Sequence, residues 1–248
     1  MLAVAPVESV KAEGKFTLQS TSNHSFSPEG SISISNVNGS ISIEGWDKAE
    51  VQIEITKKAK FSEDIEGATV SKKVSNDSIS LKSQLKTNRR GFLGLRRKSS
   101  TASISYRIHA PRTATIKRVK SVNGPIRVQQ FDGVVKGSTV NGPAELSNLT
   151  GDIEVSTVNG AIKAQLSNDI QAPEIELDTV NGSIELQLPE STSARFRGKS
   201  INGDIRNDFG LDVKKKFPIG KQLSGKTGTG EAEIELSTVN GRIVIKKL

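Results

Sequence analysis

One segment of the chain matches a motif that binds nucleotide phosphates. Residues 220–227 read Gly-Lys-Gln-Leu-Ser-Gly-Lys-Thr and satisfy the pattern G-x-x-x-x-G-K-T. That loop works when a strand leads into it and a helix follows, because the helix N-terminus then directs backbone N–H groups at phosphate. Here residues 228–236 are glycine-rich and then alternate like a strand. We therefore interpret the match as a turn sequence and predict no cofactor.

Carboxylates are a second group that could do chemistry. Some β-helix enzymes act on acidic polysaccharides with such residues gathered on one face, and the candidates here are Asp152, Glu154 and Asp204. They stand singly among lysines and arginines, and no pair within reach of one glycosidic bond is evident. The sequence thus predicts a protein that is not an enzyme, with a carbohydrate-active enzyme as the alternative.

Metal ligands and thiols are scarce. The chain has no cysteine, and its two histidines, His24 and His109, belong to no motif with ligand spacing. The aspartates of a calcium-binding nonapeptide repeat are also missing. We predict no catalytic residue and no metal site.

A basic and apolar segment, residues 86–98, is the strongest candidate for an interaction. Its sequence, KTNRRGFLGLRRK, interrupts the strand-like alternation of the chain. Apolar residues between arginines suit an anionic membrane surface or an acidic partner. The alternative is a solvated loop whose Phe92 and Leu93 pack back onto the fold. The candidate residues are Arg89, Arg90, Phe92, Leu93, Leu95, Arg96, Arg97 and Lys98.

The net charge of +8 favours acidic partners in general. A protein, a glycan or an anionic membrane surface would each fit. Stacking aromatic residues are not interleaved with the basic ones, which argues against nucleic acid. No segment approaches the ~18–20 apolar residues of a membrane-spanning helix.

These residues must be positioned by short repeated strands. Glycines recur every nine residues from Gly124 to Gly160, and every second one ends a Val-Asn-Gly turn. Between the turns apolar and polar residues alternate, as in Ile153-Glu154-Val155, which indicates half-buried strands. Strand plus turn at a fixed short period predicts a solenoid. An antiparallel meander competes, because Asn-Gly is also the strongest hairpin signal.

We predict an all-β fold, a single-stranded parallel β-helix (β-solenoid) with coils of about 18–22 residues and essentially no α-helix. Residues 1–30 are expected to form a leader or capping segment. Residues 31–248 are expected to form one solenoid domain, with longer strands over 31–120 and regular Val-Asn-Gly repeats over 121–248.

Two ladders follow if coils stack at the strand spacing of ~4.8 Å. The third residue after each motif glycine alternates in charge, which predicts an exposed salt-bridge ladder of Arg127, Glu145, Lys163, Glu185 and Arg206. The motif glycine is expected to supply a positive φ to each turn. The motif asparagines are expected to stack at one corner with amide hydrogen bonds between coils: Asn38, Asn123, Asn141, Asn159, Asn181, Asn202 and Asn240.

Three segments, SISISNVNGSISIEGWDKAEVQIEI, ISYRIHAP and GTGEAEIELSTVNGRIVI, resemble the bacterial putative-adhesin, β-strand-repeat family of unknown function. The resemblance covers residues 31–248. It implies a β-solenoid, usually outside the cytoplasm in the cell envelope, and it supplies no catalytic residues. We therefore expect a non-catalytic, adhesin-like structural or interaction module that is secreted or held in the cell envelope, its leader absent from this sequence. The alternatives are the carbohydrate-active enzyme and a cytoplasmic or membrane-facing scaffold that docks through residues 86–98.

Overall fold

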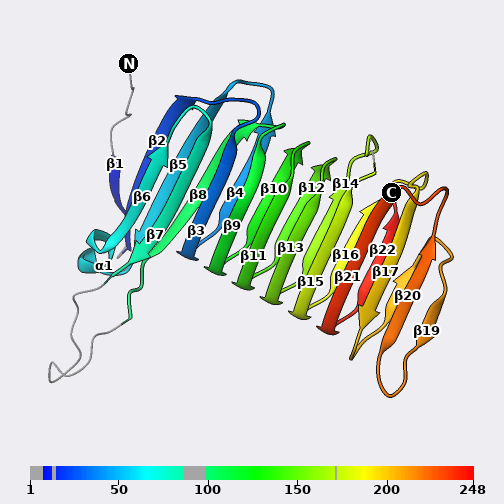
Figure 1. Cartoon of the computed structure of the whole chain (residues 1–248). Coiled ribbons are helices and arrows are strands. Elements are labelled where there is room, and N and C mark those ends of the chain that lie inside the picture. The colour runs from blue at the N-terminus through cyan, green and yellow to red at the C-terminus, as the bar shows by residue number, and fades with distance from the viewer. Residues whose placement is uncertain (1–7, 13–14, 87–98, 171) are drawn as a thin grey trace, which may run out of the picture.

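The computed structural model describes residues 8–12, 15–86, 99–170 and 172–248. Two sheets lie face to face as an elongated stack of strands (Figure 1). The candidate loop residues from Arg89 to Lys98 lie outside the described residues.

The first sheet, sheet A, has in spatial order the strands β1 (Glu8–Ala12), β2 (Lys15–Ser25), β5 (Glu50–Ala59), β8 (Ser103–Pro111), β4 (Ile41–Trp46), β10 (Ile126–Phe131), β12 (Ala144–Leu149), β14 (Ile162–Leu166), β16 (Ile184–Leu188), β22 (Ile243–Lys247) and β18 (Ile205–Asn207). The second, sheet B, has β19 (Val213–Lys215), β20 (Lys221–Lys226), β17 (Ala194–Ser200), β21 (Ala232–Asn240), β15 (Glu174–Asn181), β13 (Ile153–Asn159), β11 (Val135–Asn141), β9 (Thr115–Asn123), β3 (Ser31–Asn38), β7 (Ser78–Leu85) and β6 (Ala68–Val74). Helix α1 spans Ser62–Glu66.

The strands form where apolar and polar residues alternate. In β13 the side chains of Ile153, Val155 and Thr157 are buried, whereas those of Glu154 and Ser156 are exposed. The buried side chains of both sheets fill the space between them, and each Ile, Leu or Val so buried stabilises the fold by roughly 1.5–3 kcal/mol. The prediction of an all-β solenoid is confirmed.

The central coils are wound in parallel. Strand β11 pairs with β13 in parallel, with Asn141 opposite Asn159, and the same register places Arg127 opposite Glu145 in sheet A. Each of these coils contributes one strand to each sheet. The antiparallel meander is therefore wrong for this part of the chain.

Antiparallel strands close both ends, so the two sheets are mixed. At the N-terminal end β2 pairs with β5, β5 with β8, and β6 with β7. At the C-terminal end β20 lies antiparallel between β17 and β19. In the described part of the chain, no helix has the length and apolarity needed to cross a bilayer.

The spatial order of the coils departs from the chain order at both ends. The last coil of the chain, β21 with β22, lies between β15 with β16 and β17 with β18. The coil of β3 and β4 likewise lies inside the strands β7 and β8, which come later in the sequence. Our expectation that successive motifs occupy successive coils holds for Asn38 and Asn123 but is wrong at the C-terminal end, where the coil of Asn240 lies between those of Asn181 and Asn202.

Each Val-Asn-Gly corner is held by side-chain and backbone hydrogen bonds between coils. The motif asparagines form one ladder of amide hydrogen bonds of 2.7–3.0 Å, in the order Asn38, Asn123, Asn141, Asn159, Asn181, Asn240 and Asn202. At five corners the hydroxyl two residues before the asparagine donates to a glycine carbonyl of an adjacent coil, as Thr179 does to Gly160 at 3.0 Å.

The motif glycines are needed for close approach more than for a positive φ. Among them only Gly39 and Gly124 have a positive φ, so our expectation was wrong for the others. A Cβ on Gly142 would lie 2.4 Å from the Gly124 carbonyl oxygen, because the corners stack backbone on backbone. A side chain at this position would push adjacent coils apart.

Candidate functional site

The three carboxylates proposed from the sequence do not form one group. Asp152 accepts a backbone hydrogen bond from β15 at 2.9 Å, and Glu154 Oε2 pairs with Lys136 Nζ at 2.6 Å. Asp204 Oδ1 pairs with Lys221 Nζ at 2.5 Å, and this hydrogen bond lowers the pKa of Asp204. Each of the three thus has a partner of its own, and the set offers no free carboxylate pair.

The outer face of sheet B instead carries three rows of side chains that run across the strands. Outward positions recur five, three and one residues before each motif asparagine, and the parallel register aligns them. From β9 to β17, the charge row is Arg118, Lys136, Glu154, Glu176, Glu235 and Arg197. The serine row is Lys120, Ser138, Ser156, Asp178, Ser237 and Lys199. The valine row is Val122, Val140, Val158, Val180, Val239 and Ile201.

The middle of the charge row is acidic on three adjacent strands. Lys136 pairs with Glu154 at one side, and Arg197 Nη1 pairs with Glu235 Oε1 at 2.5 Å at the other. Glu176 lies between Glu154 and Glu235 and so has a carboxylate on each neighbouring strand. Like charges directly opposite one another destabilise a sheet.

Glu176 and Asp178 are neighbouring carboxyl groups on β15, and each influences the pKa of the other. Loss of surrounding water, the charge of Asp178 and its hydrogen bond raise the pKa of Glu176, and Glu154 and Glu235 raise it further. Burial also raises the pKa of Asp178, although hydrogen bonds from Glu176 and Ser237 act in the opposite direction. Both carboxyl groups are therefore protonated more readily than they would be in water.

A β-bulge gathers basic side chains beside this acidic centre. In β9, Ile116 lies opposite Val135 and Val119 opposite Gly137, so two residues, Lys117 and Arg118, face one residue of β11. A bulge of this kind re-aims side chains and increases the local twist. Lys117, Arg118 and Lys120 are exposed, and none of the ion pairs found within the described residues involves them.

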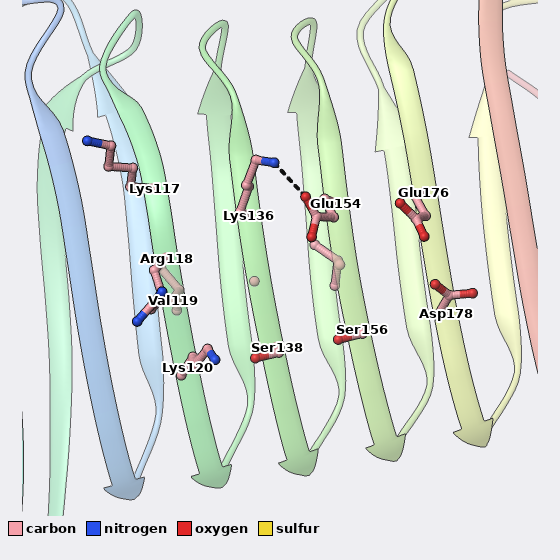
Figure 2. Close-up of a pocket in the computed structure, with 12 residues that line it drawn as sticks. Lys117, Arg118, Val119, Lys120, Lys136, Ser138, Glu154, Ser156, Glu176 and Asp178 are labelled. Carbon is pink, nitrogen blue, oxygen red and sulfur yellow. Dashed lines mark hydrogen bonds and ion pairs between the residues drawn. The ribbon is translucent and has the colours of Figure 1, made fainter.

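The basic and acidic groups border one open depression of about 400 Å³ (Figure 2). Its wall includes Lys117 and Lys120 on one side, Glu176 and Asp178 on the other, and Ser138 between them. Gly137 also lines the depression. The arrangement can hold a cation and an anion of one ligand at once, with hydroxyl groups in between as hydrogen-bond partners.

Catalysis by a metal is not indicated by the side chains in view. Within the described ranges, no three histidine or acidic side chains are placed to hold a metal ion. The segment that matches the phosphate loop is mostly strand β20, and the residues after it lead into strand β21. It lacks the helix N-terminus that would bind phosphate.

The outer face of sheet A places Arg127, Glu145, Lys163 and Glu185 on adjacent strands as the sequence predicts, but within this series only Arg127 and Glu145 form an ion pair among those found in the described residues. Arg127 Nε pairs with Glu145 Oε2 at 2.7 Å, and Glu185 Oε1 pairs with Lys246 Nζ at 2.9 Å. Arg206, however, does not lie beside Glu185, because Val244 of the inserted last coil occupies the position between them.

Our reading of the sequence missed Glu176, Asp178 and Glu235 as a group. The signal was present, because Arg118, Lys136, Glu154, Glu176 and Glu235 all stand five residues before a motif asparagine. We aligned only the residues after the glycine, which lie on the other sheet. The adjacency of Glu176 and Glu235, 59 residues apart, follows only from the insertion of the last coil.

Comparisons with known proteins bear on the whole chain. The model of the Toastrack DUF4097 family matches residues 5–246. A solved structure described as a putative cell adhesion protein from Clostridium sporogenes ATCC 15579 is 14% identical, with a TM-score of 0.50, over 93% of this chain and 100% of that one. A putative adhesin from Bacteroides fragilis NCTC 9343 is 12% identical, with a TM-score of 0.40, over 93% and 97% of the two chains. No curated protein matches. At such identity the first structure supports the fold alone.

Proposed function

Because the chain belongs to the Toastrack DUF4097 family, we propose that it is a non-enzymatic, adhesin-like module that binds an extended ionic polymer along the outer face of sheet B. The polymer carries cationic and anionic groups, and the module acts outside the cytoplasm, in the cell envelope or secreted. The names of its structural neighbours support an adhesive role. The ligand and the face are inferred from the charge row.

The observation that carries the proposal is the acidic centre beside unpaired bases. Glu154, Glu176 and Glu235 stand on adjacent strands, where like charges cost stability. Lys117 and Arg118 stand close by without ion pairs among the described residues. A row of charged side chains selected for stability alone would alternate in sign, as the row from Arg127 to Glu185 on sheet A does. Proteins depart from such stabilising patterns mainly at functional sites, so the row of like charges indicates a binding site.

The other two rows suit a polymer laid across the strands. Serine hydroxyls of the serine row can donate and accept hydrogen bonds at each strand spacing of ~4.8 Å. Val122, Val140, Val158 and Val180 leave 40–41% of their surface exposed in a continuous apolar line. A ligand running along the stack would meet charged and apolar groups side by side, with the hydroxyls of Ser138, Ser156 and Ser237 between them on three of the six strands.

Peptidoglycan sacculi are a suitable probe, because their stem peptides carry both amino and carboxylate groups. We expect the wild-type protein to sediment with purified sacculi. The variants E176Q/D178N and K117Q/K120Q should each bind at least about tenfold more weakly, since each removes one half of the charge pattern. The amount of protein in the pellet as a function of sacculus concentration measures this.

A matched control lies on the opposite face of the molecule. R127Q/E145Q removes one charge of each sign from sheet A, where the pair is 2.7 Å apart, and should bind sacculi as the wild type does. If E176Q/D178N, K117Q/K120Q and the control all bind sacculi as strongly as the wild type does, the outer face of sheet B is not the binding site. Loss of binding in the control alone would place the site on sheet A.

A carbohydrate-active enzyme is the second candidate function, favoured by the Glu176–Asp178 pair. Both carboxyl groups line the depression, and glycoside hydrolysis uses two carboxyl groups that flank the scissile bond. The test is the release of reducing ends from polygalacturonate or sacculi by the wild type and by E176Q. Release by the wild type that E176Q abolishes would support the enzyme, and no release by either would exclude it for these substrates.

A further inference from the structure

The β19–β20 hairpin at the C-terminal end of sheet B presents an apolar tip to solvent. Val213 lies opposite Leu223 and Lys215 opposite Lys221, so the strands lead directly into the loop of residues 216–220. In that loop Phe217 is 96% exposed and Ile219 is 58% exposed, the two highest values among the large apolar side chains of the described residues. The loop reaches past the ends of the neighbouring strands, at the bottom right of Figure 1.

Unpaired lysines flank this tip. Lys214, Lys215 and Lys216 are exposed, and no ion pair found within the described residues involves them. Lys221, by contrast, pairs with Asp204. Residues 212–226 contain five lysines and one aspartate, a net charge of 5 − 1 = +4 in fifteen residues. Half of the net charge of the chain, +8, is thus concentrated in one hairpin.

This combination fits one kind of partner best. An exposed aromatic and an aliphatic residue on a projecting turn have no walls of protein around them, so they can enter a soft apolar phase without rearrangement. Lysines next to the apolar residues would then lie at the level of the lipid headgroups, where anionic lipids attract them. A protein partner would instead have to supply a complete pocket for Phe217.

We propose that the hairpin tip, residues 214–219, docks the solenoid onto an anionic membrane surface. Phe217 and Ile219 enter the boundary between headgroups and acyl chains, and Lys214, Lys215 and Lys216 contact the anionic headgroups. The stack of coils would then extend away from the attachment point with its charge row free. This surface is separate from the outer face of sheet B, so the proposal does not depend on the proposed function.

Co-sedimentation with vesicles tests the proposal. The wild type should bind vesicles of phosphatidylcholine with 30% phosphatidylglycerol, a fraction chosen for the assay on the order of that in anionic membranes, and should bind much less to phosphatidylcholine alone. F217S/I219S should weaken binding about tenfold through lost burial of apolar surface. K214Q/K215Q/K216Q should weaken it by a similar factor or more, and added salt should do the same.

Two controls separate docking by the tip from general attraction. K117Q/R118Q/K120Q also removes three positive charges, but from the face of sheet B. Both triple variants therefore have a net charge of +5 (8 − 3). F61S removes a Phe that is 43% exposed. Both controls should keep wild-type binding within about twofold. Equal loss in the two triple variants would overturn the proposal in favour of unspecific charge attraction.

Insertion itself has a spectroscopic signature. F217W should show quenched tryptophan emission with vesicles whose acyl chains are brominated, whereas the wild-type signal from Trp46 should change little. Absence of vesicle binding by the wild type, or binding without quenching of F217W, would overturn insertion of the tip and leave an acidic protein as the partner to seek. A cooperative thermal melt of each variant, close to that of the wild type, is the control for an intact solenoid.

Discussion

The outer faces of sheets A and B are built from the same coils at the same spacing, yet they arrange charge differently. On sheet A, Arg127 and Glu145 pair at 2.7 Å, and opposite signs follow one another. On sheet B, Glu154, Glu176 and Glu235 stand on three adjacent strands, with basic residues collected at both ends of the row.

The difference separates what the fold needs from what a function needs. A solenoid gains a few tenths of a kcal/mol from each opposite pair on adjacent strands and loses a similar amount from each like pair. Sheet A follows that rule in its central coils. Sheet B departs from it twice along its charge row, at Arg118 and Lys136 beside the bulge and at the three glutamates. The following changes test whether the two faces differ as described, from the largest expected effect to the smallest.

Substitution G142A should disrupt the frame that both faces share. The added Cβ would lie 2.4 Å from the Gly124 carbonyl oxygen, and backbone cannot move aside without separating the coils. We expect a loss of about 3 kcal/mol in the free energy of unfolding. Urea denaturation followed by circular dichroism measures it.

Gly137 supplies the matched control, because a Cβ there would meet nothing closer than 3.6 Å. G137A should change the free energy of unfolding by less than ~1 kcal/mol. It adds a methyl group beside the depression, so it also tests binding without charge change. Equal destabilisation by G142A and G137A would contradict the view that close approach selects the motif glycine.

Charge reversal should have opposite effects on the two faces. E176K places a lysine between Glu154 and Glu235 and should stabilise the protein by ~0.5 kcal/mol, while binding to sacculi is lost. E145K places a lysine between Arg127 and Lys163 and should destabilise it by a similar amount. Melting temperatures of both variants at low salt measure the signs. Destabilisation by E176K would mean that Glu176 is not repelled by Glu154 and Glu235.

The pH dependence of stability should also differ in sign. The pKa of Glu176 is raised above its ordinary value of 4.5, and that of Asp178 above 3.8, so the folded state binds protons more readily than the unfolded one. Their contribution to stability is present below the ordinary values and is lost as the pH rises through the raised ones. Relative to E176Q/D178N, the melting temperature of the wild type should therefore fall as the pH rises above about 4.

Glu185 on sheet A provides the opposite case. Its hydrogen bond from Lys246, followed by that from Gln187, lowers the pKa of Glu185 below 4.5. Its stabilising effect is present above pH 4.5 and is lost as the pH falls through the lowered pKa. E185Q should thus lower the melting temperature at neutral pH and have no effect in strong acid. The same pH profile for both variants would remove the contrast between the faces.

Much of the fold could be predicted because each coil repeats one local rule. Alternation such as Ile153-Glu154-Val155 determines which side chains are buried, and the recurring Val-Asn-Gly motif determines where each coil turns. The asparagine ladder needs only these two periods and the strand spacing. Antiparallel pairing at the N-terminal end could not be predicted, since β5 alternates in the same way as the parallel strand β4.

The candidate site was harder to predict, because it depends on which coils are neighbours. Lys136 and Glu154 are one motif apart and could be paired from the sequence. Glu176 and Glu235 could not, because all coils offer similar apolar faces and the same corner, and many orders of stacking satisfy them equally well. The five residues 189–193 can span ~17 Å, enough to cross the ~10 Å between the two sheets together with the two strand spacings, ~10 Å, that the inserted coil requires.

The sequence alone determined that this chain forms half-buried strands joined by stacked asparagine–glycine corners, because strand alternation and turn chemistry are local properties of a few residues. Only the tertiary structure decided that the last coil enters the stack before the end, that a bulge aims Lys117 and Arg118 outward, and that three glutamates stand in line. These features depend on contacts between distant segments, whose competing arrangements differ too little in local preference to be distinguished along the chain.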